Sequence, residues 1–528
     1  MSSNRMLARA GLIVSTAFLI SRVLGWVRVV VITNAFDATA ELDAFYAAFR
    51  IPDLIFQLVA AGALSSALIP ILTELFATDD RARAWRVVST VANLMLVALA
   101  VLGVIVLVTA PTLVRAFIAP GFSPATQALT TDLTRIMILS AIFLSMGSVL
   151  TSVLNARGRF AAAAVAPIVY NVAIIGAALI LAPSMGVTGL AIGVVAGAIA
   201  VVAVQVLPVH RLGFRWVPTI DVADPVARRA LQLMAPRAIG LGASQITFVV
   251  VTALATTLSV GAVTAFTIAF TLLQIPIGLI GVPLGVVLFP SLSREVATGN
   301  HTEFAALLLR ALRAIVFVMI PVAVVTALLR TEAVALLFGR FSAPIVELTS
   351  ITLLAFSGGL VAHALIAVLA RAFYARQDTL TPVLAAVGAV VINTTLAALL
   401  VGPLGLPGIA LAIAIAAWLE AGVLLLLLAR GGVGLDLAGV ASVGARTLLA
   451  AVIAGAVGLG VRSALASRLL PDPIAGGFAA IPGLVLAILA VSVAFGLTFF
   501  AASLALRITE LRSIVEIMID ALRRPRRS

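Results

Sequence analysis

The stretch Ser21–Arg28, with the sequence SRVLGWVR, lies inside an apolar run that extends from about Gly11 to Thr33. A run of this length can cross a bilayer as one helix. Two arginines therefore lie where lipid is expected, and a charge at that depth costs about 2.5 to 3.5 kcal/mol on insertion scales. Because residues with such a cost usually face a bundle interior or a water-filled cavity, this helix predicts a polar pathway inside a membrane protein.

The geometry of the two arginines indicates a ligand larger than one carboxylate. At 100° per residue, Arg22 and Arg28 project about 120° apart, and Gly25 lies on the face between them. The helical rise separates the two charges by about 9 Å. We expect both arginines to bind a large anion.

The composition excludes an ordinary soluble protein. The 528 residues are 63% hydrophobic and 10% charged, with a mean hydropathy of +1.24, whereas globular chains are about 25% charged. The apolar runs are continuous and of helix length, which is not the alternating pattern of a β-barrel. With no cysteine and three scattered histidines, disulfides, thiol chemistry and a metal site are not expected. We expect no cofactor.

Apolar windows of about 20 residues predict an all-α, polytopic membrane protein with about fourteen transmembrane helices. The approximate cores of the predicted spans are 11–33, 44–75, 85–109, 129–154, 160–182, 187–208, 229–258, 262–290, 304–328, 345–374, 380–401, 406–429, 440–465 and 479–506. An amphipathic, basic tail over 507–528 follows. Such a tail is typical of a segment that lies along an anionic leaflet.

The distribution of arginine predicts the orientation of the chain. The net charge of +13 is carried wholly by arginine, since the sequence contains no lysine. If the N-terminus is cytoplasmic, the loops on the opposite side receive only Arg115, Arg330, Arg340, Arg462 and Arg468. Cytoplasmic loops carry the excess of positive charge in membrane proteins. We therefore expect both termini in the cytoplasm, and we interpret the charge as a sign of orientation and not of nucleic acid binding.

An internal repeat is visible in the sequence. Residues 44–49 (AFYAAF) and 69–74 (IPILTE) are echoed by 265–270 (AFTIAF) and 289–295 (FPSLSRE). The second and eighth spans therefore correspond, which predicts two six-helix lobes around a central pathway, as in alternating-access carriers. We expect an N-terminal lobe over 1–220, a C-terminal lobe over 221–432 and two additional helices over 433–506. Chance similarity between apolar helices is the alternative.

Further polar residues lie at membrane depth, mostly in the N-terminal copy. The second span carries Asp43 at its outer end, followed by Arg50, Asp53 and Gln57, and the seventh span carries Arg237. Together with the two arginines of the first span, these residues predict a water-filled cavity of net positive charge. Its ligand should be anionic.

Several of these polar residues have a second interpretation. Arg50 and Asp53 are three residues apart on one helix face and could neutralise each other. Asp43 could be an interfacial loop residue, or it could pair with the second arginine of the first span when the outer side closes. Glu420 in the twelfth span is either a polar packing residue or an ion site, and Asn171 is typical of a helix–helix hydrogen-bond partner.

A set of short segments forms a specific pattern through its order and spacing. The segments are 21–28, Asp43-Ala44-Phe45 with Pro52 and Pro70, 119–122 (APGF), 290–293 (PSLS) with 299–301 (GNH), and 373–378 (FYARQD) with Thr381-Pro382. Together they resemble the MurJ/MviN family of lipid II flippases, within the multidrug/oligosaccharidyl-lipid/polysaccharide exporter superfamily. The resemblance extends from the first span to about residue 430.

The resemblance implies a fold, a substrate and site residues. It implies fourteen helices, the last two of which form a lipid-accommodating groove. The substrate would be lipid II, an undecaprenyl diphosphate that carries a disaccharide-pentapeptide. Arg22, Arg28 and Asp43 match functional positions of the family, whose cavity arginines hold the diphosphate. Arginine suits this role because its planar fork binds phosphate oxygens in pairs and stays protonated.

The implied activity is transport by alternating access from the cytoplasmic to the outer leaflet of the bacterial inner membrane. The membrane potential and a monovalent ion are the candidate driving forces, because each elementary charge moved across 100 mV contributes about 2.3 kcal/mol. The expected partners are the lipid-linked anionic substrate, the bilayer and the cell-wall synthesis machinery. No nucleic acid partner is expected.

The sequence departs from the family pattern at four positions. The family often has an acid after the second arginine, where this chain has Val29, and a glutamate aligns with Ala61. Two family arginines align with Phe56 and Thr271. We expect Arg237 to replace the missing charge. The expected gating or supporting residues are Gly25, Asp53, Gln57, Thr271 and Gln274.

Three other functions remain as alternatives. The departures leave open a flippase for another polyprenyl-diphosphate-linked saccharide. A cation-coupled exporter of the same fold would need an acidic cavity instead of a basic one. A membrane scaffold without transport would not require buried arginines. The sequence shows no phosphate-cradling glycine-rich loop, serine nucleophile motif or catalytic carboxylate pair, so we do not expect an enzyme.

Overall fold

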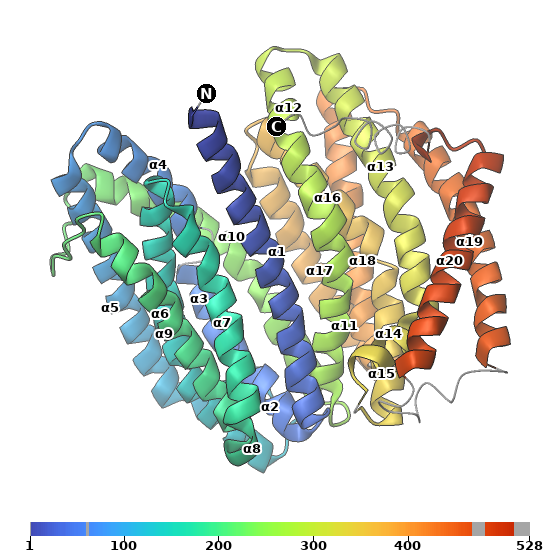
Figure 1. Cartoon of the computed structure of the whole chain (residues 1–528), viewed down its shortest axis with the longest axis horizontal. Coiled ribbons are helices and arrows are strands. Elements are labelled where there is room, and N and C mark those ends of the chain that lie inside the picture. Colours follow the sequence, from blue (N-terminus) through green and yellow to red (C-terminus); the bar gives the residue numbers. More distant parts are fainter. Residues whose placement is uncertain (1, 60–62, 340, 467–480, 512–528) are drawn as a thin grey trace. The chain divides into compact units, whose positions relative to one another are not determined.

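The computed structural model describes residues 2–59, 63–339, 341–466 and 481–511 (Figure 1). Within these ranges, the side chains of residues 2–13, 15, 63–67, 235–241, 243, 244, 432, 433 and 466 are not described. The described part of the chain consists of helices and connecting segments.

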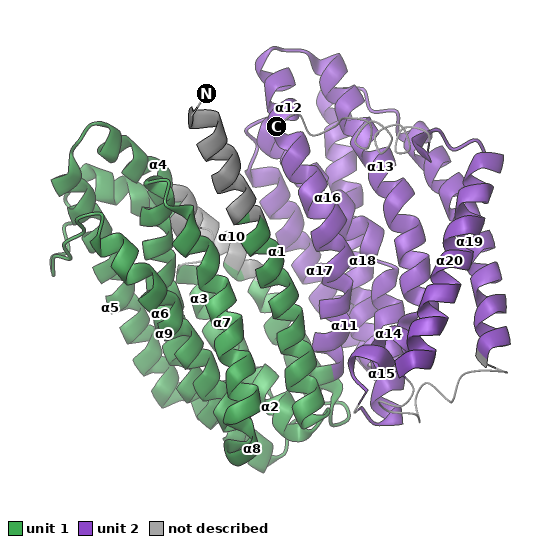
Figure 2. Cartoon of the chain, viewed as in Figure 1, with its two compact units in different colours: residues 1–264 green, residues 265–528 purple. Residues whose placement is uncertain are grey.

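The chain divides into two compact units, residues 1–264 and 265–528 (Figure 2). The helices that lie within unit 1 are α1 (Ser2–Phe36), α2 (Ala40–Ala48), α3 (Arg50–Val59), α4 (Ala63–Ala77), α5 (Arg81–Leu113), η1 (Val114–Ile118), α6 (Pro124–Ala156), α7 (Phe160–Ile180), α8 (Ala182–Met185), α9 (Val187–His210) and α10 (Pro225–Thr256). Helix α11 (Ala262–Pro276) begins at the end of unit 1.

Unit 2 continues from α11. Its further helices are η2 (Ile277–Gly281), α12 (Val282–Ala297), α13 (His301–Leu328), α14 (Arg330–Leu337), α15 (Ala343–Ser357), α16 (Leu360–Ala375), α17 (Leu380–Leu404), α18 (Leu406–Leu428), η3 (Ala429–Val433), α19 (Leu437–Ala466) and α20 (Ile481–Ala505). The division into units follows packing, whereas the predicted lobes follow the repeat. The lobe boundaries remain a prediction, and most of the predicted tail lies outside the described residues.

The polytopic helical fold is confirmed, but the count of fourteen spans is not. Among the described residues, 11 helices are long and apolar enough to cross a membrane, and the pair α15 and α16, bent by 45°, makes up to 12. The predicted spans 44–75 and 229–258 are not among them. Within the first of these, α2 ends at Ala48 and α3 begins at Arg50, while residues 60–62, between α3 and α4, lie outside the described residues. The second, α10, includes side chains that are not described.

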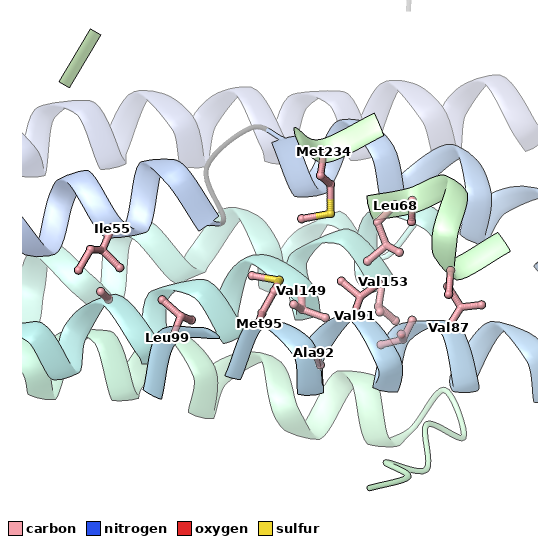
Figure 3. Packing of buried hydrophobic residues seen from close by; sticks show 14 of the residues in the cluster. Ile55, Leu68, Val87, Val91, Ala92, Met95, Leu99, Val149, Val153 and Met234 are labelled. Carbon is pink, nitrogen blue, oxygen red and sulfur yellow. The ribbon is translucent and has the colours of Figure 1, made fainter. Parts of the chain in front are cut away.

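The core of unit 1 is formed by one face of α5 and the helices packed against it. Its buried residues Val87, Val91, Met95 and Leu99 recur every fourth position, as a single helical face requires. Figure 3 shows these side chains together with residues of neighbouring helices, including Met234 of α10. Helix α10 therefore shares the core of unit 1.

Helices α7 and α9 approach closely through glycine. Gly189, Gly193 and Gly197 occur at every fourth position of α9, the spacing that lets helix backbones come together in membranes. A Cβ atom at Gly193 would lie 2.2 Å from the Cβ of Ala177, and one at Gly197 would lie 3.0 Å from Cδ2 of Tyr170. Any larger side chain at these positions would push the two helices apart.

The helix pairs α7–α9 and α17–α18 share a turn geometry, in agreement with the repeat. Gly186 and Gly405, which directly precede α9 and α18, have φ of +60° and +61°. Gly158 and Gln377 lie before α7 and α17 and have φ of +66° and +62°. They are as far apart in the sequence as Gly186 and Gly405 are. Left-handed conformations are uncommon outside glycine, so their recurrence at matching places indicates a common local structure.

The connection between α9 and α10 is bound along α5 by polar side chains. Asn93 of α5 donates to the carbonyl oxygen of Val217 at 2.8 Å and accepts from Nε1 of Trp216 at 2.8 Å. Arg83 donates from Nε to the carboxylate of Asp224 at 3.0 Å. These hydrogen bonds from Arg83 hold the pKa of Asp224 below its usual range. We call residues 211–224 the strap, because they lie fixed against the helix.

A buried carboxylate holds the segment that leads into α11. Asp43 of α2 is 1% exposed. Its Oδ2 accepts from the backbone N–H of Gly261 at 2.7 Å, and its Oδ1 accepts from the N–H and the hydroxyl of Thr264 at 2.8 and 2.7 Å. Both oxygens are therefore engaged by donors within unit 1, at the first turn of α11, where a negative charge is favourable.

In unit 2, α19 packs against α13 and pairs with α20. Arg462 of α19 forms an ion pair with Glu332 of α14, whose side chain is almost fully buried. Helix α19 also helps to line an apolar pocket of about 570 Å³ together with residues of α13, α16 and α18, including Trp418. Of the two helices that follow the predicted repeat, α19 lines this apolar space and α20 does not. The lipid-accommodating groove that the resemblance implies stays a prediction.

Replacing Gly193 by valine should destabilise unit 1. The added atoms would clash with Ala177, and overpacking of this kind costs about 1–3 kcal/mol. We expect a lower Tm and less monodisperse protein in detergent. Gly176→Val on α7 is the matched control, since a Cβ there meets nothing within 4 Å. Equal melting of the two variants would contradict the close approach of α7 and α9.

Replacing Asp43 by asparagine should also lower the Tm. The NH₂ group of the asparagine would face the N–H of Gly261 or the N–H of Thr264, and neither of these donors can accept a hydrogen bond. An unsatisfied buried polar group costs about 1–3 kcal/mol. Glu41→Gln, on the exposed side of the same helix, should melt like the parent protein. An Asp43→Asn protein with unchanged Tm would show that the hydrogen bonds to Gly261 and Thr264 contribute nothing.

Candidate functional site

Helices α1 and α7 enclose a pocket of about 500 Å³ within unit 1. Both helices are among the apolar spans. The structure brings Arg22, Gly25 and Arg28 of α1 onto this pocket, opposite residues of α7 that include Pro167 and Tyr170. The predicted arrangement of two arginines around a glycine is thus present on one surface. Gly25 adds no side chain to the lining, and a Cβ there would lie 3.9 Å from Oδ1 of Asn171, an ordinary contact distance.

The two arginines of the pocket contact aromatic rings. The guanidinium carbon of Arg22 lies 5.2 Å from the ring centroid of Phe18, and that of Arg28 lies 5.9 Å from the centroid of Tyr170. Among the described residues, neither guanidinium donates a hydrogen bond or forms an ion pair. Because attraction to a ring face leaves N–H donors free, both side chains are available to an anion.

The arginine of α3 is placed differently. Arg50 donates from Nε to Oγ1 of Thr252 at 2.7 Å, and its guanidinium carbon lies 5.6 Å from the ring centroid of Phe248. Both partners belong to α10. The described residues contain no Arg50–Asp53 ion pair within 4 Å, although the two charges still interact electrostatically. Arg50 is bonded to α10, and its neutralisation by Asp53 stays a prediction. Asp53 and Gln57 are half-buried on α3.

The remaining predicted residues are not brought to this pocket. Asp43 is engaged by the start of α11, as described above. Arg237 belongs to α10, but its side chain lies outside the described residues. Thr271 and Gln274 lie on α11 in unit 2, where the hydroxyl of Thr271 donates to the carbonyl oxygen of Thr267 at 2.7 Å and Gln274 is exposed. The substrate-binding and gating roles of all these residues remain predictions.

Sequence reasoning missed Tyr170 as a site residue. The available signal was a tyrosine inside an apolar span of a chain with only three tyrosines. Its neighbour Asn171 has the packing role that was predicted for it, since Nδ2 donates to the carbonyl oxygens of Pro167 at 2.9 Å and of Ser21 at 3.4 Å. Asn171 also lines the pocket, and its hydrogen bond to Ser21 fixes α7 against α1.

A second acidic position, Glu420, lines a separate pocket of about 350 Å³ between α17 and α18. The other lining residues are apolar except Thr381. Among the described residues, no group of three or more His, Asp or Glu could hold a metal ion. The α1–α7 pocket, which presents two arginines, is the candidate site for an anion.

Comparison with known proteins gives consistent results for sequence and fold. The family described as lipid II flippase MurJ matches residues 32–471. The chain is 35% identical to a lipid II flippase MurJ of Burkholderia cenocepacia over 81% of this chain and 84% of that protein. It is 32% identical to a probable lipid II flippase MurJ of Vibrio cholerae, over 79% of this chain and 82% of that one.

The fold is also that of solved structures. A lipid II flippase MurJ in an inward closed conformation aligns with a TM-score of 0.74 at 23% identity, over 92% of this chain and 98% of that one. An inward-facing multidrug resistance transporter of the MATE family aligns with a TM-score of 0.65 at 17% identity, over 80% of this chain and 98% of that one. The extent of the family match and the identity to curated relatives show that this multi-pass membrane protein belongs to the lipid II flippase MurJ family.

Proposed function

We propose that this chain flips lipid II from the cytoplasmic to the outer leaflet of the bacterial inner membrane. The observation that carries the proposal is the α1–α7 pocket, whose two arginines have no hydrogen-bond or ion-pair partner among the described residues. Guanidinium groups between membrane-spanning helices are costly unless an anion binds them. Membership of the MurJ family supports a lipid-linked diphosphate as that anion.

The mechanism follows from the chemistry of the pocket. Arg22 and Arg28 bind the diphosphate oxygens with their N–H donors, as forked guanidinium groups do. The polar head passes through the cavity while the polyprenyl chain stays in lipid, and the protein alternates between inward-open and outward-open states. No covalent bond is made or broken in this cycle, so the protein acts as a transporter and not as an enzyme.

The positive-inside pattern supports a cytoplasmic location of both termini. The membrane potential supports the outward movement of a negative head group, since each charge moved across 100 mV contributes about 2.3 kcal/mol. A monovalent ion is the alternative source of energy. Delivery of the lipid to cell-wall synthesis enzymes at the outer face completes the proposed role.

A second candidate is a flippase for another polyprenyl-diphosphate-linked saccharide. The observation that favours it is the absence of arginine at Phe56 and Thr271, where the family has cationic residues. These two substrates share the diphosphate and differ in the head group, so the α1–α7 pocket would serve either. Arg237 is proposed to supply the missing charge in both cases.

The substrate is tested by replacing an essential lipid II flippase with this chain in a conditional strain. We expect viable cells with lipid II accessible at the outer face. Death with lipid II accumulating at the inner face, despite a well-expressed protein, would contradict lipid II as the substrate.

Arginine variants in the same strain test the site. Arg28→Ala should abolish growth and Arg237→Ala should impair it, because each removes a proposed diphosphate contact. Arg135→Ala is the matched control, since Arg135 lies on a membrane-spanning helix but is already bonded to the carbonyl oxygen of Leu107 and paired with Asp132. Full growth of Arg237→Ala beside a dead Arg28→Ala would refute the replacement role of Arg237.

A further inference from the structure

The arginines of the α1–α7 pocket differ in how their rings are held. Phe18 lies four residues before Arg22 on the same helix and is 61% exposed. Tyr170 comes from a different helix than Arg28 and is half-buried. A ring on the same exposed helix face moves with its arginine, whereas a ring from a packed neighbouring helix fixes the position of the cation.

Tyr170 is itself held by the close approach of α9. A Cβ at Gly197 would lie 3.0 Å from Cδ2 of Tyr170 and 3.1 Å from its carbonyl oxygen. A side chain at this position would require the ring or the backbone of Tyr170 to shift. The position of Arg28 thus depends on a chain of contacts that runs from Gly197 through Tyr170.

The wall that carries Tyr170 is also fixed against α1. Asn171, the next residue, donates to the carbonyl oxygen of Ser21 at 3.4 Å, and it is 7% exposed. Contacts with α9 therefore fix the tyrosine ring, and the hydrogen bond from Asn171 fixes α7 against α1. Arg28 also interacts electrostatically with Asp53 and Tyr46, but among the described residues its N–H groups donate no hydrogen bond.

We propose that Tyr170 is a positioning residue that orients Arg28 as the fixed anchor for one phosphate of a polyprenyl diphosphate, with Arg22 as the adjustable second contact. This inference rests on the proposed function. Preorientation of a binding group lowers the cost of ordering it when ligand arrives. Loss of the ring should therefore weaken binding through Arg28 and leave the charge itself in place.

The test measures binding of geranylgeranyl diphosphate to the purified full-length protein by isothermal titration calorimetry. Tyr170→Leu should raise Kd by about threefold to thirtyfold, the range expected for loss of a cation–π contact. Tyr170→Phe retains the ring and should bind like the parent protein. Phe160→Leu, an exposed aromatic on the same helix outside the pocket, is the matched control and should also bind normally.

A double-mutant cycle separates positioning from general support of the fold. In an Arg28→Ala background, Tyr170→Leu should cause no further loss of affinity, because the residue it positions is absent. A ring that only supports the fold would lower the affinity by the same factor in both backgrounds. Tyr170→Met, of similar bulk but without a ring face, repeats the measurement if the leucine variant does not fold.

The outcomes distinguish this inference from the function on which it rests. If Arg28→Ala binds the diphosphate as tightly as the parent protein, the proposed function of the pocket is refuted. If Arg28→Ala weakens binding but Tyr170→Leu and Tyr170→Met are neutral, or additive with it, only the positioning role of Tyr170 is refuted.

Discussion

Unit 1 is organised around a constraint: a guanidinium group inside a membrane-spanning helix is energetically unfavourable without a partner. The structure places these groups in two kinds of environment. Arg50 donates to the hydroxyl of Thr252 and lies over the ring of Phe248, so it connects α3 with α10. Arg22 and Arg28 contact aromatic rings and, among the described residues, form no hydrogen bond or ion pair. Their remaining hydrogen-bonding capacity supports the proposal that this pocket binds an anion.

The close packing of α7 and α9 makes this arrangement possible. The glycines of α9 allow α7 to approach, and α7 presents Tyr170 and Asn171 to α1. Small residues at a helix interface therefore affect a binding site that they do not line. In water, burial of apolar surface would drive such an approach, but between helices in lipid the gain comes from close contact itself. Loss of a contact between α7 and α9 would therefore change the position of the α7 residues that line the pocket.

Part of the fold could be predicted from the sequence because it depends on local composition. Continuous apolar runs predict α5, α9 and α20, and the arginines of α1 stand out by their charge alone. The role of Asp43 could not be predicted, since its partners lie 218 and 221 positions away. The interruption between α2 and α3 within 44–75 and the ring beneath Arg28 depend equally on tertiary packing. The sequence pattern identified charged residues, but not which of them the fold would satisfy.

The strap along α5 changes how the connection between α9 and α10 should be regarded. A free segment of this length would behave as a random coil with a root-mean-square end-to-end distance of about 20 Å. Here Asn93 and Arg83 hold it at several points, and the entropy of a free coil is already lost. The connection is therefore a segment attached to α5 and not an entropic spring. Because Asp224 is also the N-cap of α10, its bond with Arg83 joins α5 directly to the start of α10.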